Sequence, residues 1–285
     1  MAHNHWDHLK KLLALLDHPR VDIFLHIDKK SDVSDPDSFA RVLKHSAFYR
    51  IPSICVNWGG CSQIRCELDL IGAALPGKYA YYHLLSGVDL PLKPMDEILA
   101  FFDANGGKEF IHMDAPELPV HFYERFSVYY PFQEMVRRVP LLEKIQWRLV
   151  ALQRKIGIDR LKKQNLLFAK GANWFSCTHD FLSDLYEHRA QILKDYRFTR
   201  CCDEVFLQSH LIRTPFRSRL WDPTCSNSSL SNMRLIDWDR GQPYTFRDED
   251  LSELLKSDLL FARKFDDEKY PGVVDGIYRA IKNKE

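Results

Sequence analysis

The sequence predicts an α/β fold, because strand-like and helix-like segments alternate over its first 115 residues and polar residues follow the strand-like segments. This alternation is typical of parallel strands joined by helices, and ligands bind beside the carboxyl ends of such strands. We therefore expect a mostly parallel central sheet. Residues 117–167 become aromatic and then basic and helical, without a clear linker, which predicts a helical insertion in one continuous domain.

The first elements follow from the spacing of hydrophobic residues. Leucines at helical intervals predict a helix over residues 8–17, and apolar alternation predicts a strand over 21–27 that ends in a polar turn. A second helical pattern covers 34–43, and a short apolar run over 53–56 predicts another strand. The next helix begins at Ser62, its expected N-cap, and continues to position 75.

The later elements continue the alternation. A buried type of strand over 81–85 is followed by a helix over 95–102 and a strand over 109–113. The remaining expected elements are helices over 135–163, 180–193 and 203–211, a strand over 174–177 and a loop over 222–232.

Composition narrows the function classes. A chain of 285 residues with 45% hydrophobic residues can bury a sizeable core. Forty basic and 39 acidic residues give a net charge of +1, so the bulk charge predicts neither nucleic acid nor an anionic membrane as a partner. No apolar run reaches the ~18 residues of a membrane span. The seven cysteines form no C-x-x-C pair and predict free thiols in a reducing compartment.

The most informative segment is 257–266, where Arg263 and Lys264 lie inside a frame of leucine and phenylalanine. Charge at a packed rim needs an anionic partner to offset its desolvation. A guanidinium that donates to phosphate oxygens, beside an ammonium group, suits a diphosphate. The alternative is the end of an amphipathic helix whose two basic side chains extend into solvent.

Eight segments, taken in chain order, match one known family. The chain resembles the core-2/I-branching β-1,6-N-acetylglucosaminyltransferase family, which also contains the peptide O-xylosyltransferases. The resemblance implies a GT-A-like nucleotide-sugar fold, a UDP-sugar donor, inversion at the anomeric carbon, and no metal or other cofactor. The matching segments are MAHNH (1–5), HIDKKS (26–31), WGGCS (58–62), LLSGVDLPLK (84–93), GANWF (171–175), DE (203–204), RLIDW (234–238) and FARKF (261–265).

The resemblance also implies how the roles are distributed along the chain. A single glycosyltransferase domain would span residues 1–285, with 1–115 mainly binding the nucleotide. Residues 116–285 would supply the acceptor side, the catalytic base and the diphosphate clamp. The implied donor-binding residues are His3, Asp28, Trp58, Ser86, Arg234, Arg263 and Lys264.

Several of these positions have a plainer alternative. The resemblance implies that Asp28 accepts a hydrogen bond from uracil, whereas a turn or N-cap carboxylate is the alternative. Trp58 lines the donor site in xylosyltransferase-like members, or it fills the core. Without a metal, Arg234, Arg263 and Lys264 would neutralise the departing UDP. The alternative for Arg234 is a charge that merely flanks a strand.

Glu204 is the expected catalytic base. An inverting transferase needs one group that removes the proton of the acceptor hydroxyl as its oxygen attacks, and the resemblance implies a glutamate in this element. Acids also begin helices for electrostatic reasons alone, which is the alternative here. Asn173 stands where the xylosyltransferase branch has an aspartate thought to act as base. GlcNAc is therefore the expected donor sugar, and UDP-xylose is the alternative donor.

No metal site is expected. Asp89 lies where many GT-A enzymes place a metal-binding carboxylate, but the matching motif does not depend on metal, and a turn-stabilising role fits at least as well. Three D-x-D patterns occur, at 35–37, 237–239 and 248–250, and none follows a buried strand at mid-sequence. No set of His, Cys and Asp has the spacing of a metal site.

The acceptor is expected to be a glycan or a lipid-linked saccharide. The chain lacks the membrane anchor and stem of the mammalian members, which predicts a soluble bacterial protein of the cytoplasm. It would act at the inner face of the membrane with at most a peripheral association, and no nucleic-acid partner is expected. The second alternative is a UDP-sugar-binding protein without transfer activity, which would keep Asp28, Arg263 and Lys264 but would not need Glu204.

Overall fold

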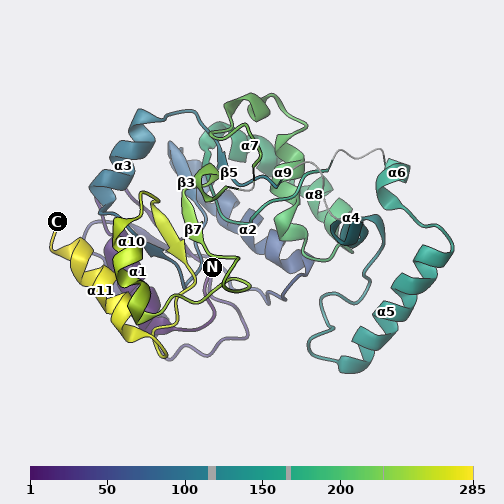
Figure 1. The fold of residues 1–285 in the computed structure, drawn as a ribbon, viewed down its shortest axis with the longest axis horizontal. Helices are drawn as coiled ribbons and strands as arrows, with labels where there is room; N and C mark the ends of the chain where they lie inside the picture. The colour runs from purple at the N-terminus through teal and green to yellow at the C-terminus, as the bar shows by residue number, and fades with distance from the viewer. Residues whose placement is uncertain (115–119, 165–167, 227, 285) are drawn as a thin grey trace. The chain divides into compact units, whose positions relative to one another are not determined.

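Figure 1 shows the chain as a computed structural model that describes residues 1–114, 120–164, 168–226 and 228–284. The chain divides into two units, each built from separated parts of the sequence. Unit 1 contains Met1–Ser53, His83–Gly107 and Asn232–Glu285, and unit 2 contains Ile54–Tyr82 and Lys108–Ser231. Both of the expected sequence parts, before and after position 115, therefore contribute to both units.

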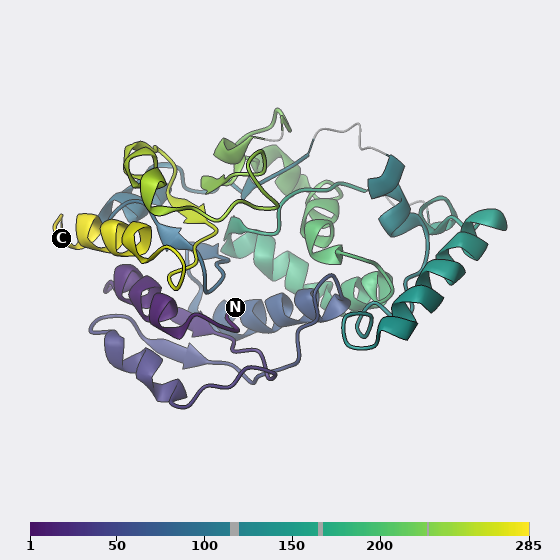
Figure 2. The same cartoon turned by 60° about the horizontal axis from the view of Figure 1, so that its bottom comes forward.

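Unit 1 has a core formed by amphipathic helices from opposite ends of the chain. Helices α1 (Trp6–Leu16) and α11 (Pro271–Lys282) contact each other and lie side by side in Figures 1 and 2. Leucines of α1 and valines of α11 belong to the same buried cluster, as their helical spacing requires. The other helices of this unit are α3 (Met95–Ala104), α10 (Leu251–Lys256) and the 3₁₀ helices η1 (Pro36–Val42) and η6 (Asp248–Asp250).

Unit 1 also contains two small sheets. In the first, β1 (Ile23–Leu25) pairs in parallel with β2 (Phe48–Arg50). In the second, β8 (Phe261–Arg263) lies between β4 (Leu90–Pro91), which is antiparallel to it, and β7 (Arg234–Ile236), which is parallel to it. Two of the predicted cations, at positions 234 and 263, therefore come from neighbouring strands.

Unit 2 is mainly helical around one three-stranded sheet. The strand order is β3–β6–β5, and β5 (Phe110–Ile111) runs antiparallel to β6 (Phe175–Thr178). Helix α2 (Cys61–Ala74) contacts α7, α8 and the 3₁₀ helix η3. The remaining elements are β3 (Tyr81–His83), η2 (Leu75–Gly77), α4 (Val120–Ser127), α5 (Pro140–Lys155), α6 (Arg160–Gln164), α7 (His179–Glu187), α8 (Arg189–Tyr196), η3 (Cys202–Glu204), α9 (Phe206–Leu211), η4 (Pro215–Arg219) and η5 (Ser229–Ser231).

The α/β composition matches the prediction, but the described residues do not show a mostly parallel central sheet. The three sheets have two or three strands each, and two of them contain an antiparallel pair. The expected strand over 53–56 is also wrong, because the partner of β1 lies earlier in the chain. Ile51 N donates to Leu25 O at 3.0 Å, and the next residue is Pro52, which has no N–H to continue the pairing.

Ser62 is not the N-cap that the sequence suggested. Helix α2 begins at Cys61, and the Ser62 hydroxyl is engaged elsewhere. Its Oγ accepts a hydrogen bond from Asn57 N at 2.8 Å and donates to the Glu134 carboxylate at 2.8 Å. The same carboxylate accepts from Ser62 N at 2.8 Å, so a distant acidic side chain serves the start of this helix in place of a local cap.

Other predicted elements differ in type or continuity, among them the helices over 135–163 and 203–211, each of which is divided in two. The segment 34–43 forms a 3₁₀ helix rather than an α-helix. The segment 257–266 contains strand β8, so its two cations do not lie at a helix end. The predicted helix over 180–193 is broken at His188. Its side chain bonds to Asp184 O through Nδ1 at 2.8 Å, and its N–H donates instead to Leu185 O at 3.2 Å.

Candidate functional site

The N-terminal residues join two of the predicted donor-binding segments in unit 1. Ala2 N donates to His26 O at 2.9 Å, and Asp28 N donates to Ala2 O at 3.0 Å. On the other side, Gly87 N donates to Met1 O at 2.8 Å. A Cβ atom at Gly87 would lie 2.9 Å from the Ala2 Cβ, so this close approach requires glycine. Residues 1 and 2 thus connect the loop that contains Asp28 with the loop that contains Ser86. His3 is the next residue.

Asp28 is a buried carboxylate that organises the first of these loops. Its Oδ1 accepts from Lys30 N at 2.8 Å, and its Oδ2 lies 3.3 Å from Lys30 Nζ. Partial desolvation lowers the pKa of the exposed His3, the Asp28 carboxylate raises it, and the Lys30 and Lys264 charges lower it. His3, Asp28 and Lys264 are therefore close enough to interact electrostatically. Asp28 therefore stabilises a turn. Its contact with uracil stays a prediction.

Ser86 and Asp89 form the second loop and connect it to Arg263. Asp89 Oδ1 accepts from Ser86 Oγ at 2.7 Å, and its Oδ2 accepts from Ser86 N at 2.8 Å. The Arg263 guanidinium forms an ion pair with Asp89, with 3.5 Å between Nε and Oδ1. Burial lowers the pKa of Arg263, and Asp89 opposes that effect. Asp89 therefore stabilises a turn, which is the turn-stabilising role that the sequence suggested, and also pairs with a cation.

The three predicted cations differ in exposure. Arg234 is only 2% exposed, donates through Nη1 to Asn232 O at 2.6 Å, and lies over the Phe261 ring with its Cζ 5.2 Å from the ring centroid. Arg263 is also buried, whereas the Lys264 side chain is exposed. Burial and the Arg234 charge lower the pKa of His83 to about 3, so this histidine is neutral near pH 7.

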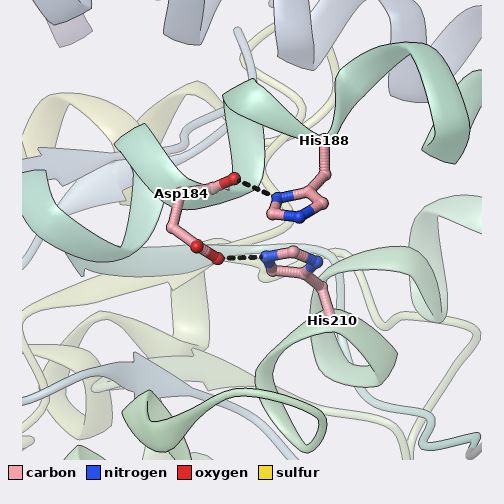
Figure 3. A group of neighbouring side chains, drawn as sticks. All are labelled: Asp184, His188 and His210. Carbon is pink, nitrogen blue, oxygen red and sulfur yellow. Dashed lines mark hydrogen bonds and ion pairs between the residues drawn. The ribbon is translucent and has the colours of Figure 1, made fainter.

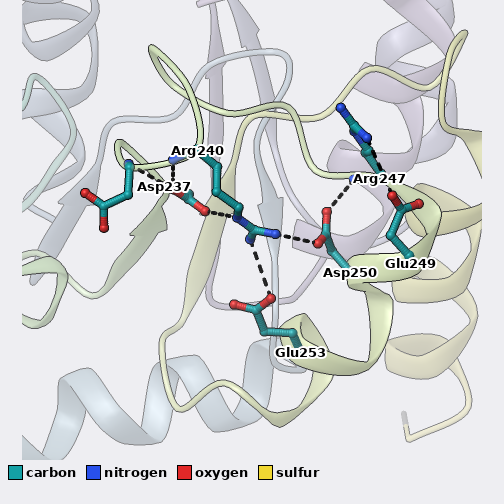
Figure 4. Close-up of polar contacts among 7 residues, drawn as sticks. Asp237, Arg240, Arg247, Glu249, Asp250 and Glu253 are labelled. Carbon is teal, nitrogen blue, oxygen red and sulfur yellow. Dashed lines mark hydrogen bonds and ion pairs between the residues drawn. The ribbon is translucent and has the colours of Figure 1, made fainter.

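Acidic side chains of the two D-x-D patterns near the C-terminus form ion pairs with arginine. Figure 4 shows Arg240 between the acidic groups of two such patterns. Arg240 donates to Asp237 through Nε, and to Asp250 Oδ1 through Nη1 at 2.8 Å. Asp250 also accepts from Arg247 N at 2.8 Å, and Asp237 accepts from Arg240 N at 2.8 Å. These carboxylates stabilise the loop before α10.

Trp58 lies in unit 2 and does not fill the core, because 49% of it is exposed. The Arg137 guanidinium lies over its ring, with the Cζ 4.1 Å from the centroid, and Arg200 lies at 5.9 Å. The following Gly59 has φ +68° and accepts at its oxygen from Cys201 N at 2.8 Å. This bond ties the Trp58 loop to the segment that carries Glu204.

Glu204 ends η3 and is held by two cations. Its Oε2 lies 3.3 Å from Arg125 Nη1 and 3.6 Å from Lys170 Nζ, and its side chain is 30% exposed. Lys170 also pairs with Asp114, with 2.8 Å between Nζ and Oδ2. Both cations lie over the Phe122 ring, each 4.6 Å from its centroid. The expected base is thus partly accessible, and both of its ion pairs are made by the same oxygen, Oε2.

Two buried acids beside Glu204 were not predicted as a pair. Asp203 accepts at Oδ2 from Gln63 Nε2 at 3.2 Å, and burial together with the Glu204 charge raises the pKa of Asp203 to about 7. Glu67 on α2 accepts from Asn173 Nδ2 at 3.0 Å. Burial and the Asp203 charge raise the pKa of Glu67 well above its usual value.

The signal that could have found this pair is weak. Glu67 directly precedes the apolar face over Leu68–Leu75. No local pattern predicts its contact with Asp203, which lies 136 positions later. Within the described residues, Glu67 Oε2 and Asp203 Oδ1 are both buried without a hydrogen-bond partner. A carboxyl group that stays protonated in such surroundings avoids the cost of a buried charge.

One group of three residues in the described part of the chain could hold a metal ion. Asp184, His188 and His210 in unit 2 each offer a ligand atom, and these atoms lie within 4.8 Å of one another (Figure 3). The sequence analysis missed this group, because the third ligand is 22 positions from the second. Within the same residues, no helix is long and apolar enough to cross a membrane.

Comparisons with known proteins point to one family. The family model "Branch: Core-2/I-Branching enzyme" matches residues 1–259. Xylosyltransferase 2 of Mus musculus is 24% identical over 282 residues, which cover 90% of this chain and 30% of the mouse protein. Xylosyltransferase 2 of Homo sapiens is 24% identical over 281 residues, with the same shares. Xylosyltransferase oxt of Drosophila pseudoobscura pseudoobscura is 23% identical over 285 residues, again with these shares.

The chain thus spans 30% of the length of these relatives. The matches do not test the expected bacterial origin, which stays a prediction.

Proposed function

The chain belongs to the Core-2/I-Branching enzyme family, and from this membership we propose that it transfers a sugar from a UDP-sugar to a glycan hydroxyl group. Family membership supports a transferase over the alternative of a binding protein without activity. The proposal includes a GT-A-like fold, inversion at the anomeric carbon and a transfer step that needs no metal ion.

The observation that carries the proposal is the group of predicted donor residues that unit 1 brings together. Backbone hydrogen bonds connect the segments of His3, Asp28 and Ser86, and Phe265 N donates to Val88 O at 3.1 Å beside them. Arg263 is held in place by Asp89, while the neighbouring Lys264 is exposed. In the proposal, Arg263 and Lys264 contact the diphosphate, Arg234 adds positive charge, and Asp28 accepts from uracil. The predicted role of Trp58 in donor binding is kept, since its ring is exposed.

The proposed reaction is one displacement. The acceptor oxygen forms a bond to the anomeric carbon as the bond from that carbon to UDP breaks, and the electron pair leaves with the diphosphate. Glu204 accepts the proton of the acceptor hydroxyl. The cations on β7 and β8 offset the charge that develops on the diphosphate. Arg125 and Lys170 orient Glu204 through its Oε2, and the other carboxylate oxygen receives the proton.

Two UDP-sugars are candidate donors. The argument for GlcNAc rests on Asn173, which cannot act as a base. Asn173 is only 6% exposed and donates to Glu67, so its side chain is bonded to a buried carboxyl group. The absence of an aspartate at 173 therefore carries little weight for the acceptor chemistry. Because the relatives carry the name xylosyltransferase, UDP-xylose is a second candidate donor beside UDP-GlcNAc.

A donor screen tests the proposal. Purified protein is incubated with UDP-GlcNAc, UDP-xylose and other UDP-sugars in the presence of EDTA, and released UDP is measured with and without saccharide acceptors. With one of these donors, we expect the wild-type protein to release UDP faster than the Glu204→Gln variant does. Binding of a UDP-sugar with no release under any acceptor condition would favour the binding-protein alternative. Failure to bind any UDP-sugar would overturn the proposal.

We further propose that the protein associates peripherally with anionic lipid at the inner face of the membrane, where a lipid-linked acceptor would be available. The support is α5, which leaves Leu141 and Leu152 exposed at 64% and 52%. Residues 136–155 contain six basic side chains and one acidic side chain, although the whole chain has a net charge of only +1. Exposed leucines beside basic residues are typical of helices that bind a membrane surface. All six of these basic residues are exposed, namely Arg137, Arg138, Lys144, Arg148, Arg154 and Lys155.

Sedimentation with vesicles tests this association. We expect binding to phosphatidylcholine vesicles that contain phosphatidylserine, weak binding to phosphatidylcholine alone, and loss of binding in high salt. The double variant Leu141→Ser, Leu152→Ser should lose binding. Leu230→Ser is the matched control, because Leu230 is exposed to a similar extent on η5. Equal sedimentation of the double variant and the wild type would contradict the role of α5.

A further inference from the structure

We propose that Asp184, His188 and His210 form a zinc-binding site in unit 2. None of these residues has a role in the proposed glycosyl transfer, so the inference goes beyond that function. One candidate ligand atom of each residue lies within 4.8 Å of those of the other two. Figure 3 shows the Asp184 carboxylate and both imidazole rings gathered between the end of α7 and α9. The two rings lie 5.2 Å apart, measured between centroids.

The chain positions two of the ligands through helix periodicity. Asp184 and His188 are four residues apart at the C-terminal end of α7, so their side chains lie on the same helix face. His210 comes from α9, and Phe181 packs beside its ring, with 6.0 Å between the centroids. Tertiary packing therefore brings the third ligand to a pair that the sequence places locally.

The hydrogen bond of His188 leaves its second ring nitrogen ready to bind a metal. His188 Nδ1 lies 2.8 Å from the main-chain oxygen of Asp184. A carbonyl oxygen can only accept, so Nδ1 carries the hydrogen, and Nε2 of the neutral ring keeps its lone pair. Metal-binding histidines are commonly oriented in this way, by donation of the other ring nitrogen to a carbonyl or carboxylate.

A zinc ion could replace the hydrogen between the other two side chains. His210 Nε2 lies 2.6 Å from Asp184 Oδ2. With zinc bonded to each atom at about 2.0–2.2 Å in tetrahedral geometry, these two atoms would be about 3.3 Å apart. The side chains would therefore separate by several tenths of an ångström. His188 would move inward, and because its side chain is exposed it can do so.

The ligand set selects the class of ion. Magnesium and calcium prefer sites made of oxygen ligands, whereas two imidazoles and one carboxylate suit zinc. Three protein ligands leave a fourth position for water, and the exposed His188 shows that solvent reaches the group. Zinc at this point would tie the end of α7 to α9, which begins two residues after Glu204. We expect it to stabilise unit 2 without taking part in sugar transfer.

Calorimetry with zinc and the metal-free protein tests the site. We expect one zinc ion per chain and a higher melting temperature when zinc is added. Cobalt bound in its place should give visible absorption of a four-coordinate nitrogen and oxygen site, without the intense charge-transfer band of a cysteine thiolate. His210→Ala should weaken zinc binding by at least the ~10–100-fold that loss of an outer-shell partner costs. His188→Gln should also weaken zinc binding, because it removes the imidazole ligand.

Folding and specificity have separate controls. His18→Ala removes a histidine whose Nε2 lies 3.0 Å from Asp96 Oδ1 in unit 1, and it should leave zinc binding unchanged. Circular dichroism of the metal-free variants checks that each one folds. Stoichiometric zinc binding that survives in both His210→Ala and His188→Gln would overturn the proposal, as would the absence of zinc binding at micromolar concentration. These measurements use no sugar donor, so their failure is distinguishable from a failure of the proposed function.

Discussion

Asp203 and Glu204 are neighbours in sequence but have different surroundings, and this difference decides which of them can act as the base. Glu204 is accessible and paired with Arg125 and Lys170, whereas Asp203 is buried and bonded to Gln63. A group that removes a proton from an acceptor hydroxyl must reach that hydroxyl. The surroundings therefore favour Glu204 over Asp203.

Glu204→Gln should abolish nearly all transfer, because a positioned base contributes typically ~10²–10⁴-fold to the rate. Affinity for UDP and the melting temperature should stay close to those of the wild type, since glutamine keeps the size of the side chain. The measurements are initial rates of transfer, calorimetry with UDP and thermal melting. Retained transfer in the folded variant would exclude Glu204 and direct attention to Asp203.

Asp203 should make stability depend on pH. Its pKa is raised from 3.8 to about 7 in the fold, so between these values the folded state holds a proton that the unfolded state releases. Stability contributed by this group is present at low pH and is lost as the pH rises through 7, by up to about 1.4 kcal/mol per pH unit in that window. The charged groups that face it are Glu204, Glu67, Arg125 and Lys170.

Asp203→Asn copies the uncharged form and should reduce this pH dependence. We expect the free energy of unfolding, measured by urea denaturation, to decrease less between pH 5 and pH 8 in the variant than in the wild type. Parallel pH profiles for the two proteins would show that folding does not raise the pKa of Asp203.

Lys264→Ala should weaken UDP binding by roughly 1.5–3 kcal/mol, the range for hydrogen bonds to charged groups. The same range applies to Arg263→Ala, but that change also leaves the buried Asp89 without its ion pair and should lower the melting temperature. Lys264 is exposed, so its variant should melt like the wild type. Calorimetry with UDP measures the affinity of both variants.

Lys269→Ala, which removes a nearby exposed cation paired with Asp266, is the matched control. Unchanged affinity in both variants would refute the diphosphate clamp.

At the scale of elements, the junction between β6 and α7 shows how one polar residue can serve a strand, a helix and a buried acid. Thr178 ends β6 and is the N-cap of α7, where its Oγ1 accepts from Phe181 N at 3.4 Å. The same hydroxyl donates to Glu109, and Thr178 N donates to Glu109 Oε2 at 2.9 Å. Burial raises the pKa of Glu109, while these bonds lower it.

Thr178→Ala should destabilise the protein by about 1–3 kcal/mol, because it removes a helix cap and leaves an oxygen of a buried carboxyl group without its hydroxyl donor. Thr178→Ser keeps the hydroxyl and should recover most of the loss. Thermal and urea denaturation measure the difference. Equal stability of the alanine and serine variants would show that the hydroxyl contributes nothing at this junction.

At the scale of the whole molecule, sugar transfer and the proposed zinc site should respond differently to the removal of metal. The transfer step is proposed to need no ion, because cationic side chains neutralise the diphosphate, whereas the site at His210 is proposed to bind zinc. Excess EDTA should therefore leave transfer largely intact at temperatures well below melting and should lower the melting temperature. Complete loss of transfer in EDTA, restored by Mn²⁺, would contradict metal-independent transfer.

The sequence alone predicted the family, the mixed α/β composition and most helices, because these depend on local motifs and on the spacing of apolar residues. The family match over residues 1–259 confirms the first of these. Local pattern failed where a distant group changed the outcome. Ser62 lost its expected capping role because Glu134 serves the start of α2, and the helix over 180–193 was interrupted because the His188 side chain took the Asp184 carbonyl.

Tertiary structure decided the features that depend on contacts between distant residues. The sequence named Asp28, Ser86 and Arg263, but only folding connected their segments through Ala2, Gly87 and Val88. Only folding placed Glu67 beside Asp203 and His210 beside Asp184. Sequence spacing constrains neighbours along one helix or strand, whereas burial, pKa and metal-binding geometry depend on groups that packing brings together.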